Sequence, residues 1–376
     1  MQRSVTQDSG IFRKRKGTVI NMKVKITGTG SCLPKLRVTN EDLSQIVDTS
    51  DEWIRSRTGI EARHLCVEET TTGMSTEAAE KALKSAGIKP GDVDLIIAAT
   101  VSADKYLPGL ACEVQSNLGA DAAVAFDINA ACSGFLFALD TAAMYLEHNQ
   151  WNHALILGAE TLSKMMDWTD RSTCVLFGDG AGAAVLSRSE EDGLLSMVQG
   201  SDGSRGNVLN CNARAVKNPF TGAADEKTDY VAMNGQEVYK FAVKTVPEAI
   251  SEAVEKSGLR MEEIDLFLLH QANYRIIESV AKRLGQPMEK FPTNLQECGN
   301  ISAASVPILL DNVRNHGMIT TGMNIVLAGF LKEYEKANAR TGKQQYAVPY
   351  FMSSHPGCTM KEAVKLAEYV RDLGFT

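Results

Sequence analysis

One cysteine of this sequence lies where a nucleophile would be expected. Residues 125–147, AFDINAACSGFLFALDTAAMYLE, predict a strand, a turn and a helix, with Cys132 at the turn where the helix begins. Helix N-termini carry unpaired N–H groups and positive potential, which favour the thiolate, the attacking form of cysteine. The small neighbours Ala131 and Ser133 leave room for a substrate to reach sulfur. The same pattern also fits a buried structural cysteine, so both interpretations stay open at this level.

Two further residues of suitable chemistry occur later in the chain. The apolar run 264–269 predicts a buried strand, and His270 follows it at the carboxyl end, where site residues of parallel sheets usually lie. In the stretch ECGNISAASVP, Asn300 falls in a turn just before a helix. Taken alone, His270 could be a core histidine and Asn300 a helix N-cap. Their relation to Cys132 depends on how the chain is organised.

The chain contains one structural unit twice. Residues 76–100, TEAAEKALKSAGIKPGDVDLIIAAT, match residues 247–271, PEAISEAVEKSGLRMEEIDLFLLHQ, at a constant offset of 171. Each copy predicts an amphipathic helix that ends at a glycine, then a short turn, then a strand buried on both faces. Helices that alternate with apolar strands predict parallel sheets covered by helices.

The same offset continues through the rest of the unit. Cys132 aligns with Ala303, and each stands at the start of an equivalent predicted helix. We therefore expect an α/β fold of two pseudo-symmetric halves, residues 22–195 and 196–330. Such symmetry would bring Cys132 together with the histidine and the asparagine at the centre of the molecule.

Composition limits the partners and the compartment. The 376 residues carry a formal net charge of −7, which argues against a nucleic-acid footprint. The eight cysteines form no C-x-x-C pair, so neither a metal site nor a disulfide scaffold is indicated, and a reducing cytoplasm is expected. No run of 18 apolar residues occurs, so no membrane span is expected. Residues 1–21 are polar and basic and predict a flexible N-terminal extension.

Motifs distributed over residues 22–330 resemble those of one enzyme family. They are GTGSCLP, DTSDEWIRSRTGI, AACSGF, DRSTCVLFGDGAGAAVL, HQANYRI and GNISAASVP. In these motifs the chain resembles β-ketoacyl-[acyl-carrier-protein] synthase III, the initiating condensing enzyme of bacterial type II fatty-acid synthesis. The resemblance implies a thiolase-like five-layer αβαβα fold and a homodimer. It also implies that Cys132, His270 and Asn300 form a catalytic triad.

The resemblance assigns binding residues as well. An aromatic ring and guanidinium groups can hold an adenine, and a local basic patch can raise the encounter rate with an acidic protein even on a net-acidic chain. The coenzyme A channel would be lined by Trp53, Arg57, Arg171 and Asn273. The surface for the acyl carrier protein would consist of Lys240, Arg275, Lys282 and Arg283. The acyl pocket would be shaped by Leu107 and Phe330.

The activity that the resemblance implies is a decarboxylative Claisen condensation. Cys132 would take a short acyl group, most simply acetyl, from its coenzyme A thioester, and malonyl-acyl carrier protein would then extend it. His270 and Asn300 would donate hydrogen bonds to the enolate oxygen. The coenzyme A thioester is a substrate, and no metal or other cofactor is implied. Two alternatives stay open: another thiolase-fold acyltransferase, or an inactive module that binds coenzyme A and carrier protein.

The resemblance to the synthase family stops after Phe330. The family continues with a glycine run and a final strand, whereas residues 331–376 resemble part of a radical S-adenosylmethionine protein of the YgiQ type. The repeat indicates the same loss, because the segment FGDGAGAAVLS of the first half has no counterpart after VLAG at 326–329. We therefore expect a foreign-looking tail, a final strand missing from the second half, and activity impaired by the altered C-terminus.

Overall fold

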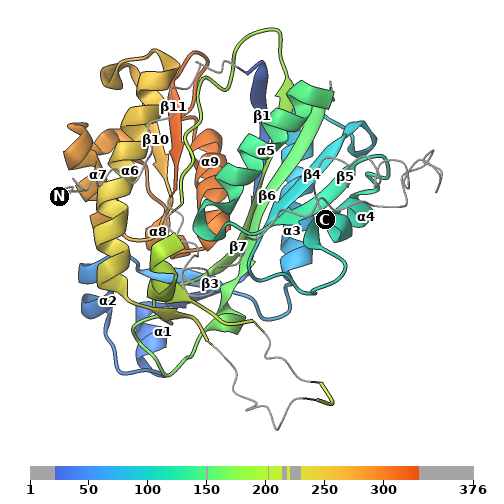
Figure 1. Cartoon of the computed structure of the whole chain (residues 1–376). Helices are drawn as coiled ribbons and strands as arrows, with labels where there is room; N and C mark the ends of the chain where they lie inside the picture. Colours follow the sequence, from blue (N-terminus) through green and yellow to red (C-terminus); the bar gives the residue numbers. More distant parts are fainter. Residues whose placement is uncertain (1–21, 150, 202, 214–217, 221–229, 330–376) are drawn as a thin grey trace, which may run out of the picture. The chain divides into compact units, whose positions relative to one another are not determined.

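The computed structural model describes residues 22–329, apart from 150, 202, 214–217 and 221–229. All of them belong to one compact unit, residues 1–335. The second unit, residues 336–376, lies outside the described residues, as does the predicted extension 1–21. Figure 1 shows how the helices and strands of the first unit are arranged.

The first half is built around a five-stranded sheet. Its strands follow the order β1-β7-β6-β4-β5. Strands β6, β4 and β5 run parallel, but β7 is antiparallel to both β6 and β1. The expectation of a parallel sheet is therefore wrong for this edge, because no crossover helix of the kind that parallel neighbours need joins β6 to β7. The bounds are β1 Val24–Cys32, β4 Leu95–Ala99, β5 Val124–Ile128, β6 His153–Thr161 and β7 Asp179–Arg188.

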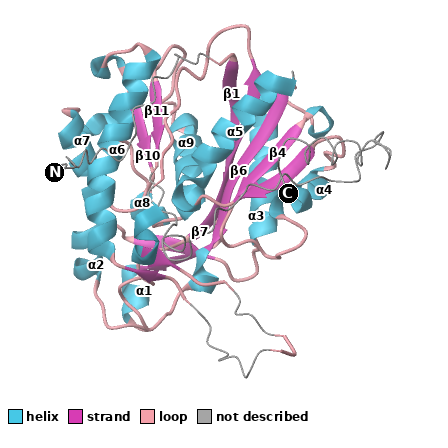
Figure 2. Ribbon diagram, in the orientation of Figure 1, coloured by secondary structure: helices cyan, strands magenta, loops and turns pink. Residues whose placement is uncertain are grey.

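Helices cover both faces of this sheet (Figure 2). On one face, α3 and α4 share a core of small and aliphatic side chains with β4, β6 and β7. On the other face, α5 packs against β4 and β6. Helix α3 ends at Gly87, whose φ of +70° is the left-handed conformation that glycine adopts most readily, as the sequence predicts. The bounds are α3 Thr71–Ala86, α4 Leu110–Leu118 and α5 Gly134–Asn149.

The second half repeats these units at the predicted offset. Helix α9 begins 171 residues after α5, and β10 begins 171 residues after β4. The short 3-10 helices η2 (Ala131–Ser133) and η7 (Ser302–Ala304) keep the same offset. The bounds are α6 Gly235–Ser257, β10 Leu266–Leu269, α7 Tyr274–Leu284, α8 Leu295–Cys298, α9 Ser305–Asn315 and β11 Ile325–Ala328.

Helix α9 joins the two halves. It contacts β1 and β7 of the first sheet and also contacts β10. Strands β10 and β11 pair in parallel, with Leu266 opposite Ile325. Helix α6 contacts both β11 and α7, and the ring of Phe267 in β10 stacks on that of Phe291 at a centroid distance of 4.7 Å. Within the described residues, the second sheet thus has two strands where the first has five.

The remaining elements form two antiparallel strand pairs, β2 with β3 and β8 with β9, and two short helices. Buried Arg63 of β3 ties this region to the body of the first unit, because its guanidinium donates to Asn40 Oδ1 (2.8 Å) and to the Val175 carbonyl (2.6 Å). None of the described helices is long and apolar enough to cross a membrane. The bounds are β2 Leu36–Thr39, α1 Asn40–Ser44, α2 Asp51–Thr58, β3 Ala62–Leu65, β8 Leu209–Asn210 and β9 Ala232–Met233.

Candidate active site

Cys132 lies in η2, the turn between β5 and α5. The residue before it, Ala131, has φ +42°, a left-handed conformation that a non-glycine residue rarely adopts and that surrounding packing must stabilise. The repeat reproduces this conformation, since Ser302 in η7 has φ +43°. The two strained turns are equivalent, and only the first presents a thiol, because Ala303 takes the position of Cys132 in the second.

The two turns meet where the halves join. Elements η2 and η7 are in contact, and glycines allow the close approach. A Cβ on Gly134 would lie 3.4 Å from the Cβ of Ala303, and a Cβ on Gly158 would lie 2.2 Å from the Ala303 carbonyl oxygen. In turn, a Cβ on Gly329, the repeat mate of Gly158, would lie 3.0 Å from Ser133 Oγ. Each half therefore places a glycine against the turn of the other half.

Asn300 is fixed by backbone contacts beside β7. Its N–H donates to the Leu176 carbonyl (2.9 Å), and its carbonyl accepts from the N–H of Gly178 (3.0 Å). Its side-chain Oδ1 accepts the N–H of Ser302 at 2.9 Å. Because Oδ1 is engaged by the backbone, the Nδ2 group is the part of the side chain suited to donate to a ligand.

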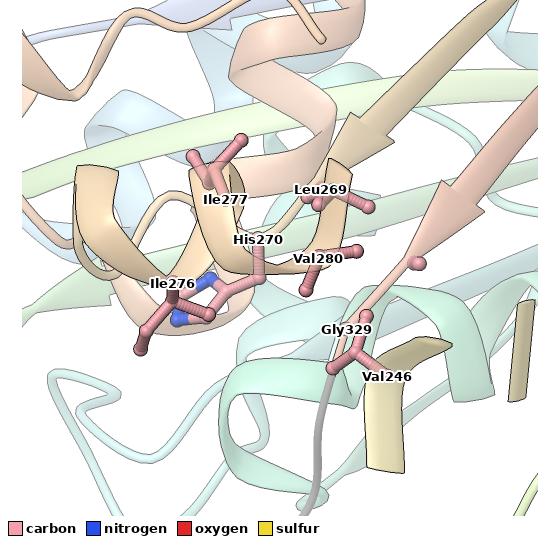
Figure 3. Close-up of a pocket in the computed structure, with 8 residues that line it drawn as sticks. Val246, Leu269, His270, Ile276, Ile277, Val280 and Gly329 are labelled. Carbon is pink, nitrogen blue, oxygen red and sulfur yellow. The ribbon is translucent and has the colours of Figure 1, made fainter. Parts of the chain in front are cut away.

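His270 follows β10, as the sequence predicts, and is 2% exposed. Its N–H donates to the Ala328 carbonyl at 2.8 Å. The imidazole lines a cavity of about 10 Å³ with apolar residues of α6 and α7 and with Gly329 (Figure 3). Burial lowers the pKa of His270 to about 3, so the ring is neutral near pH 7. A neutral imidazole can donate one hydrogen bond to a developing oxyanion without adding a charge of its own.

Gly329 connects the histidine to the cysteine. It borders the cavity of His270 and also faces Ser133, the residue after Cys132. Asn300 leads directly into η7, which contacts the turn of Cys132. The structure therefore brings the three candidate catalytic residues into one region, although they lie far apart in the chain.

The protonation state of Cys132 differs from the expectation. Burial raises the pKa of the Cys132 thiol to about 11; the nearby carboxyl of Glu160 also raises it, and a hydrogen bond with Ser302 lowers it. The prediction of a thiolate is therefore wrong for the resting protein, because burial removes the sulfur from water and this desolvation disfavours its charged form. Cys132 rests as a thiol and has to lose its proton as it attacks.

Two residues near Cys132 were not identified from sequence. Glu160 lies near the carboxyl end of β6. Both Ser102 Oγ and the N–H of Val101 donate to its Oε2, the latter at 3.1 Å. Burial raises the pKa of Glu160 to about 7, and hydrogen bonds, including one from Ser302, oppose the rise. Ser302 could have been found as the repeat mate of Ala131. Glu160 could have been found as the charged residue that directly follows the apolar run 154–159.

The four residues assigned to a coenzyme A channel lie together. The guanidinium carbons of Arg57 and Arg171 lie 4.7 and 5.2 Å from the ring centroid of Trp53. Asn273 caps α7 by accepting from the N–H of Arg275 (2.9 Å), and its Nδ2 donates to the Arg57 carbonyl (3.0 Å). A partly exposed indole beside two cations suits a flat, negatively charged nucleotide.

The basic residues assigned to the carrier protein all lie exposed on α6 or α7. Arg275, Lys282 and Arg283 belong to α7, and Lys240 belongs to α6, where it pairs with Glu237 at 2.8 Å. Arg275 also donates to the Ser56 carbonyl (2.6 Å), which connects this surface to the helix of Trp53.

Only one of the two acyl-pocket residues, Leu107, lies within the described residues. Leu107 is 86% exposed in the loop before α4, so in a single chain its side chain closes no pocket among the described residues. Phe330 lies outside the described residues.

The fold is that of the condensing acyltransferases with a thiolase-like α/β architecture. A family model described as 3-oxoacyl-[acyl-carrier-protein (ACP)] synthase III matches residues 126–203. A second, described as 3-oxoacyl-[acyl-carrier-protein (ACP)] synthase III C terminal, matches residues 254–331. The chain is 48% identical over 307 residues to β-ketoacyl-[acyl-carrier-protein] synthase III of Clostridium acetobutylicum, covering 82% of this chain and 94% of the relative. The chain therefore belongs to the β-ketoacyl-[acyl-carrier-protein] synthase III family.

Solved structures agree with this assignment. The 3-oxoacyl-[acyl-carrier-protein] synthase III of Aquifex aeolicus superposes with a TM-score of 0.77 at 44% identity, covering 82% of this chain and 96% of that one. OleA of Xanthomonas campestris, solved with bound lauric acid and lauroyl-CoA, has a TM-score of 0.72 at 25% identity, covering 82% and 95%. The resemblance of residues 331–376 to a radical S-adenosylmethionine protein finds no support in these comparisons, and the second family model ends at residue 331.

Proposed function

We propose that this chain condenses a short acyl group, taken from coenzyme A, with malonyl-acyl carrier protein to start fatty-acid synthesis. The observation that carries the proposal is the contact between the two repeat-related turns. One turn contains Cys132, the other follows Asn300, and Gly329 lies between Ser133 and the cavity of His270. The family name supports the carrier-protein substrate, and the lauroyl-CoA bound to OleA supports a coenzyme A thioester as the acyl donor.

In the first half-reaction, Cys132 Sγ attacks the thioester carbonyl and loses its proton. The C–S bond to coenzyme A breaks, and coenzyme A leaves as a thiol that carries the proton. Trp53, Arg57, Arg171 and Asn273 would hold the nucleotide end of coenzyme A during this step. Because Cys132 rests as a thiol, the step needs a proton acceptor, and the departing coenzyme A sulfur can serve as the final one.

In the second half-reaction, malonyl-acyl carrier protein loses carbon dioxide. The electron pair of the broken C–C bond forms an enolate, whose thioester oxygen accepts hydrogen bonds from the His270 imidazole and from Asn300 Nδ2. The α-carbon then attacks the acyl carbonyl on Cys132, and the sulfur leaves and regains a proton. Lys240, Arg275, Lys282 and Arg283 would receive the carrier protein.

Several structural features belong to the same proposal. These are the five-layer αβαβα arrangement with halves 22–195 and 196–330, a homodimer in which Leu107 of one chain reaches the acyl pocket of the other, and a second half without its final strand. Contacts of α9 with strands on both sides support the layered arrangement, and the exposure of Leu107 and Tyr106 supports an intermolecular role for that loop.

An inactive module that binds coenzyme A and carrier protein is the second candidate. It is favoured by a large cavity that reaches Ser133 and Gly329, next to the candidate nucleophile. A two-stage assay separates the candidates. Radiolabelled acetyl-CoA should label Cys132, and added malonyl-acyl carrier protein should convert the label to a β-ketoacyl product. Binding of coenzyme A without labelling of Cys132 would support the inactive module, and labelling followed by a different product would indicate another thiolase-fold acyltransferase.

A further inference from the structure

Glu160 is a buried carboxyl near the candidate nucleophile that the two half-reactions do not use. Its side chain is fully buried in β6, and no cation is among the groups that act most strongly on it. Burying a carboxylate without a cation is costly, so such a group serves either a structural contact or the movement of a proton. The contacts of its two oxygens indicate which role each of them has.

One oxygen of the Glu160 carboxyl holds the loop that follows β4. Oε2 accepts the N–H of Val101 at 3.1 Å and the hydroxyl of Thr100 at 3.3 Å, and it also accepts the hydroxyl of Ser102. Ser102 in turn ties this loop to the end of β6, because its Oγ accepts the N–H of Thr161 at 2.8 Å. This oxygen therefore has a structural role.

The other oxygen, Oε1, is buried and accepts no hydrogen bond of ordinary geometry from the described residues. The carboxyl also interacts with the turn η7, where the Ser302 hydroxyl and the backbone of Ala303 stabilise its charged form. The same hydroxyl forms a hydrogen bond with Cys132 that stabilises the thiolate. Ser302 therefore interacts with both the carboxyl and the thiol, which suits a group that passes a proton between them.

Packing between β6, η7 and η2 brings these side chains together. Turn η7 contacts β6 and also contacts η2, the turn of Cys132. A Cβ on Gly158, two residues before Glu160, would lie 2.2 Å from the Ala303 carbonyl oxygen. A larger residue at position 158 would push β6 away from η7, so this glycine allows Glu160 to approach Ser302.

The backbone of η7 does not require a hydroxyl at position 302. Ser302 has φ +43°, and Ala131, its repeat mate in η2, has φ +42° with only a methyl side chain. The N–H of Ser302 donates to Asn300 Oδ1 at 2.9 Å, a contact that alanine would keep. The conformation of the turn leaves the hydroxyl unexplained, whereas its interactions with Cys132 and Glu160 account for it.

We infer that Ser302 passes the proton of the Cys132 thiol to Glu160 as Cys132 attacks the thioester. The S–H bond breaks and its proton moves to Ser302 Oγ, while the proton of Oγ moves to the carboxylate, which becomes a carboxylic acid. The sulfur electron pair forms the new C–S bond. When the old C–S bond breaks, Glu160 returns the proton through Ser302 to the coenzyme A sulfur. The inference rests on the proposed acyl transfer to Cys132 and names the proton acceptor that this transfer needs.

Other titratable groups around Glu160 have separate partners. Lys164, in the turn after β6, donates to carbonyls of the loop after β4. Asp179 of β7 accepts from Ser163 and from the N–H of Cys66. His270 is neutral above its pKa of about 3, and η7 contains no titratable side chain. Among the described residues, Glu160 is therefore the acceptor available to Ser302.

Single-turnover acetylation of the full-length protein tests the inference. The probe is acetyl-CoA, and acetyl-Cys132 is measured by mass spectrometry from about pH 6 to about pH 9. In the wild type, the rate should rise as Glu160 loses its proton around its pKa of about 7 and then level off. Glu160→Gln keeps an oxygen for the contacts with Val101 and Ser102 but cannot take a proton. It should slow acetylation by about 10²-fold near pH 7, and its rate should continue to rise with the thiolate fraction up to about pH 9.

The direction of this change separates proton transfer from a simple charge effect. The negative charge of Glu160 raises the pKa of Cys132. If Glu160 acted only as a charge, Glu160→Gln would favour the thiolate and leave acetylation unchanged or faster. A slower variant with an altered pH profile is therefore expected only if the carboxylate accepts the proton.

Two serine variants test the link between the thiol and the carboxyl. Ser302→Ala keeps Glu160 but removes the hydroxyl, and it should reproduce the slow, continuously rising profile of Glu160→Gln. Ser305→Ala is the matched control, since it removes a buried hydroxyl at the start of α9 that accepts a backbone N–H at 3.1 Å. It should keep the wild-type profile.

Each contrary result has a separate meaning. Acetylation of Glu160→Gln at the wild-type rate or faster would overturn the inference and leave the proposed function intact. A wild-type profile for Ser302→Ala would exclude its hydroxyl as the link, and equal slowing by Ser305→Ala would attribute the effect to packing; both would also overturn the inference alone. Absence of acetyl-Cys132 in the wild type would contradict the proposed function, and the inference with it.

Discussion

The two halves of this chain are built from one repeated unit, yet they differ in how completely the unit is packed. In the first half, β7 lies between β6 and β1, and Ile156 in the middle of β6 is fully buried. In the second half, the repeat mate of Ile156 is Leu327 of β11, which is only partly buried and lines a cavity of about 960 Å³. Both halves retain the helices and strands that the repeat encodes. The comparison shows that burial of the central strand depends in addition on a neighbouring strand.

The difference in chemistry between the halves is the first to test, and its expected effect is the largest. Cys132→Ala should reduce acyl transfer from acetyl-CoA by about 10³-fold or more, because it removes the nucleophile. Adding Ala303→Cys to this variant places a thiol in the equivalent turn of the second half. We expect that acyl labelling, measured by mass spectrometry, will not return. Acyl transfer needs the side chains around η2 as well as the backbone conformation that the two turns share. Labelling of residue 303 would show that the two turns are interchangeable.

A second test concerns packing. Ile156→Ala should lower the free energy of unfolding by about 2–5 kcal/mol, because it opens a cavity in a closed core. Leu327→Ala, at the equivalent position of β11, should cost clearly less, about 1 kcal/mol, because the side chain already borders open space. Urea denaturation measures both changes in the free energy of unfolding, provided that the variants and the wild type have equal m values. Equal costs would mean that the second half is as tightly packed as the first.

A third test uses the carboxyl buried in the first half. The pKa of Glu160 in the folded protein, about 7, lies above its usual value of 4.5. The stability associated with the protonated carboxyl is therefore fully present below pH 4.5 and is lost as pH rises through about 7. We expect a loss of about 3 kcal/mol across this interval. Glu160→Gln should remove that part of the pH dependence in urea titrations at pH 4.5, 6 and 8. An unchanged profile would place the titration elsewhere.

A fourth test separates the roles of residues from the two halves. His270→Ala and Asn300→Ala should spare most acyl loading on Cys132 but slow condensation by about 10²-fold or more, because each removes a donor to the enolate oxygen. Single-turnover assays with pre-acylated enzyme isolate the second step. Normal condensation by His270→Ala would exclude the imidazole from the mechanism.

The smallest effect is expected at the surface. Arg275→Glu, on α7 of the second half, should raise the apparent KM for malonyl-acyl carrier protein by about tenfold and leave acetyl-CoA loading unchanged. Lys84→Glu, an equally exposed reversal on α3 of the first half, is the matched control and should change neither step. The wild-type reaction should weaken with salt, because exposed charges are screened within roughly 10 Å at 0.1 M. Equal damage to both steps by Arg275→Glu would indicate a structural role through its contact with Ser56.

Much of the fold and of the candidate site can be predicted from the sequence. The offset of 171 predicts the equivalence of α5 with α9 and of β4 with β10, and the glycines at 87 and 258 predict two helix ends with left-handed caps. Cys132 at a turn before a helix, and His270 after a buried strand, are where the patterns expect them. Each of these features depends on the spacing of residues within or next to a single helix or strand. That spacing can be read directly from the sequence.

Other features were decided only by the tertiary structure. The antiparallel direction of β7, the raised pKa of Cys132, and the approach of Glu160 and Ser302 to it all depend on segments that are distant in the chain. Desolvation depends on what packs around a group from every side, and local sequence does not specify those neighbours. The same holds for the cavity beside β11: the repeat shows that β7 has no counterpart among the described residues of the second half, but only the packing of α5, α6 and β11 shows where the cavity lies.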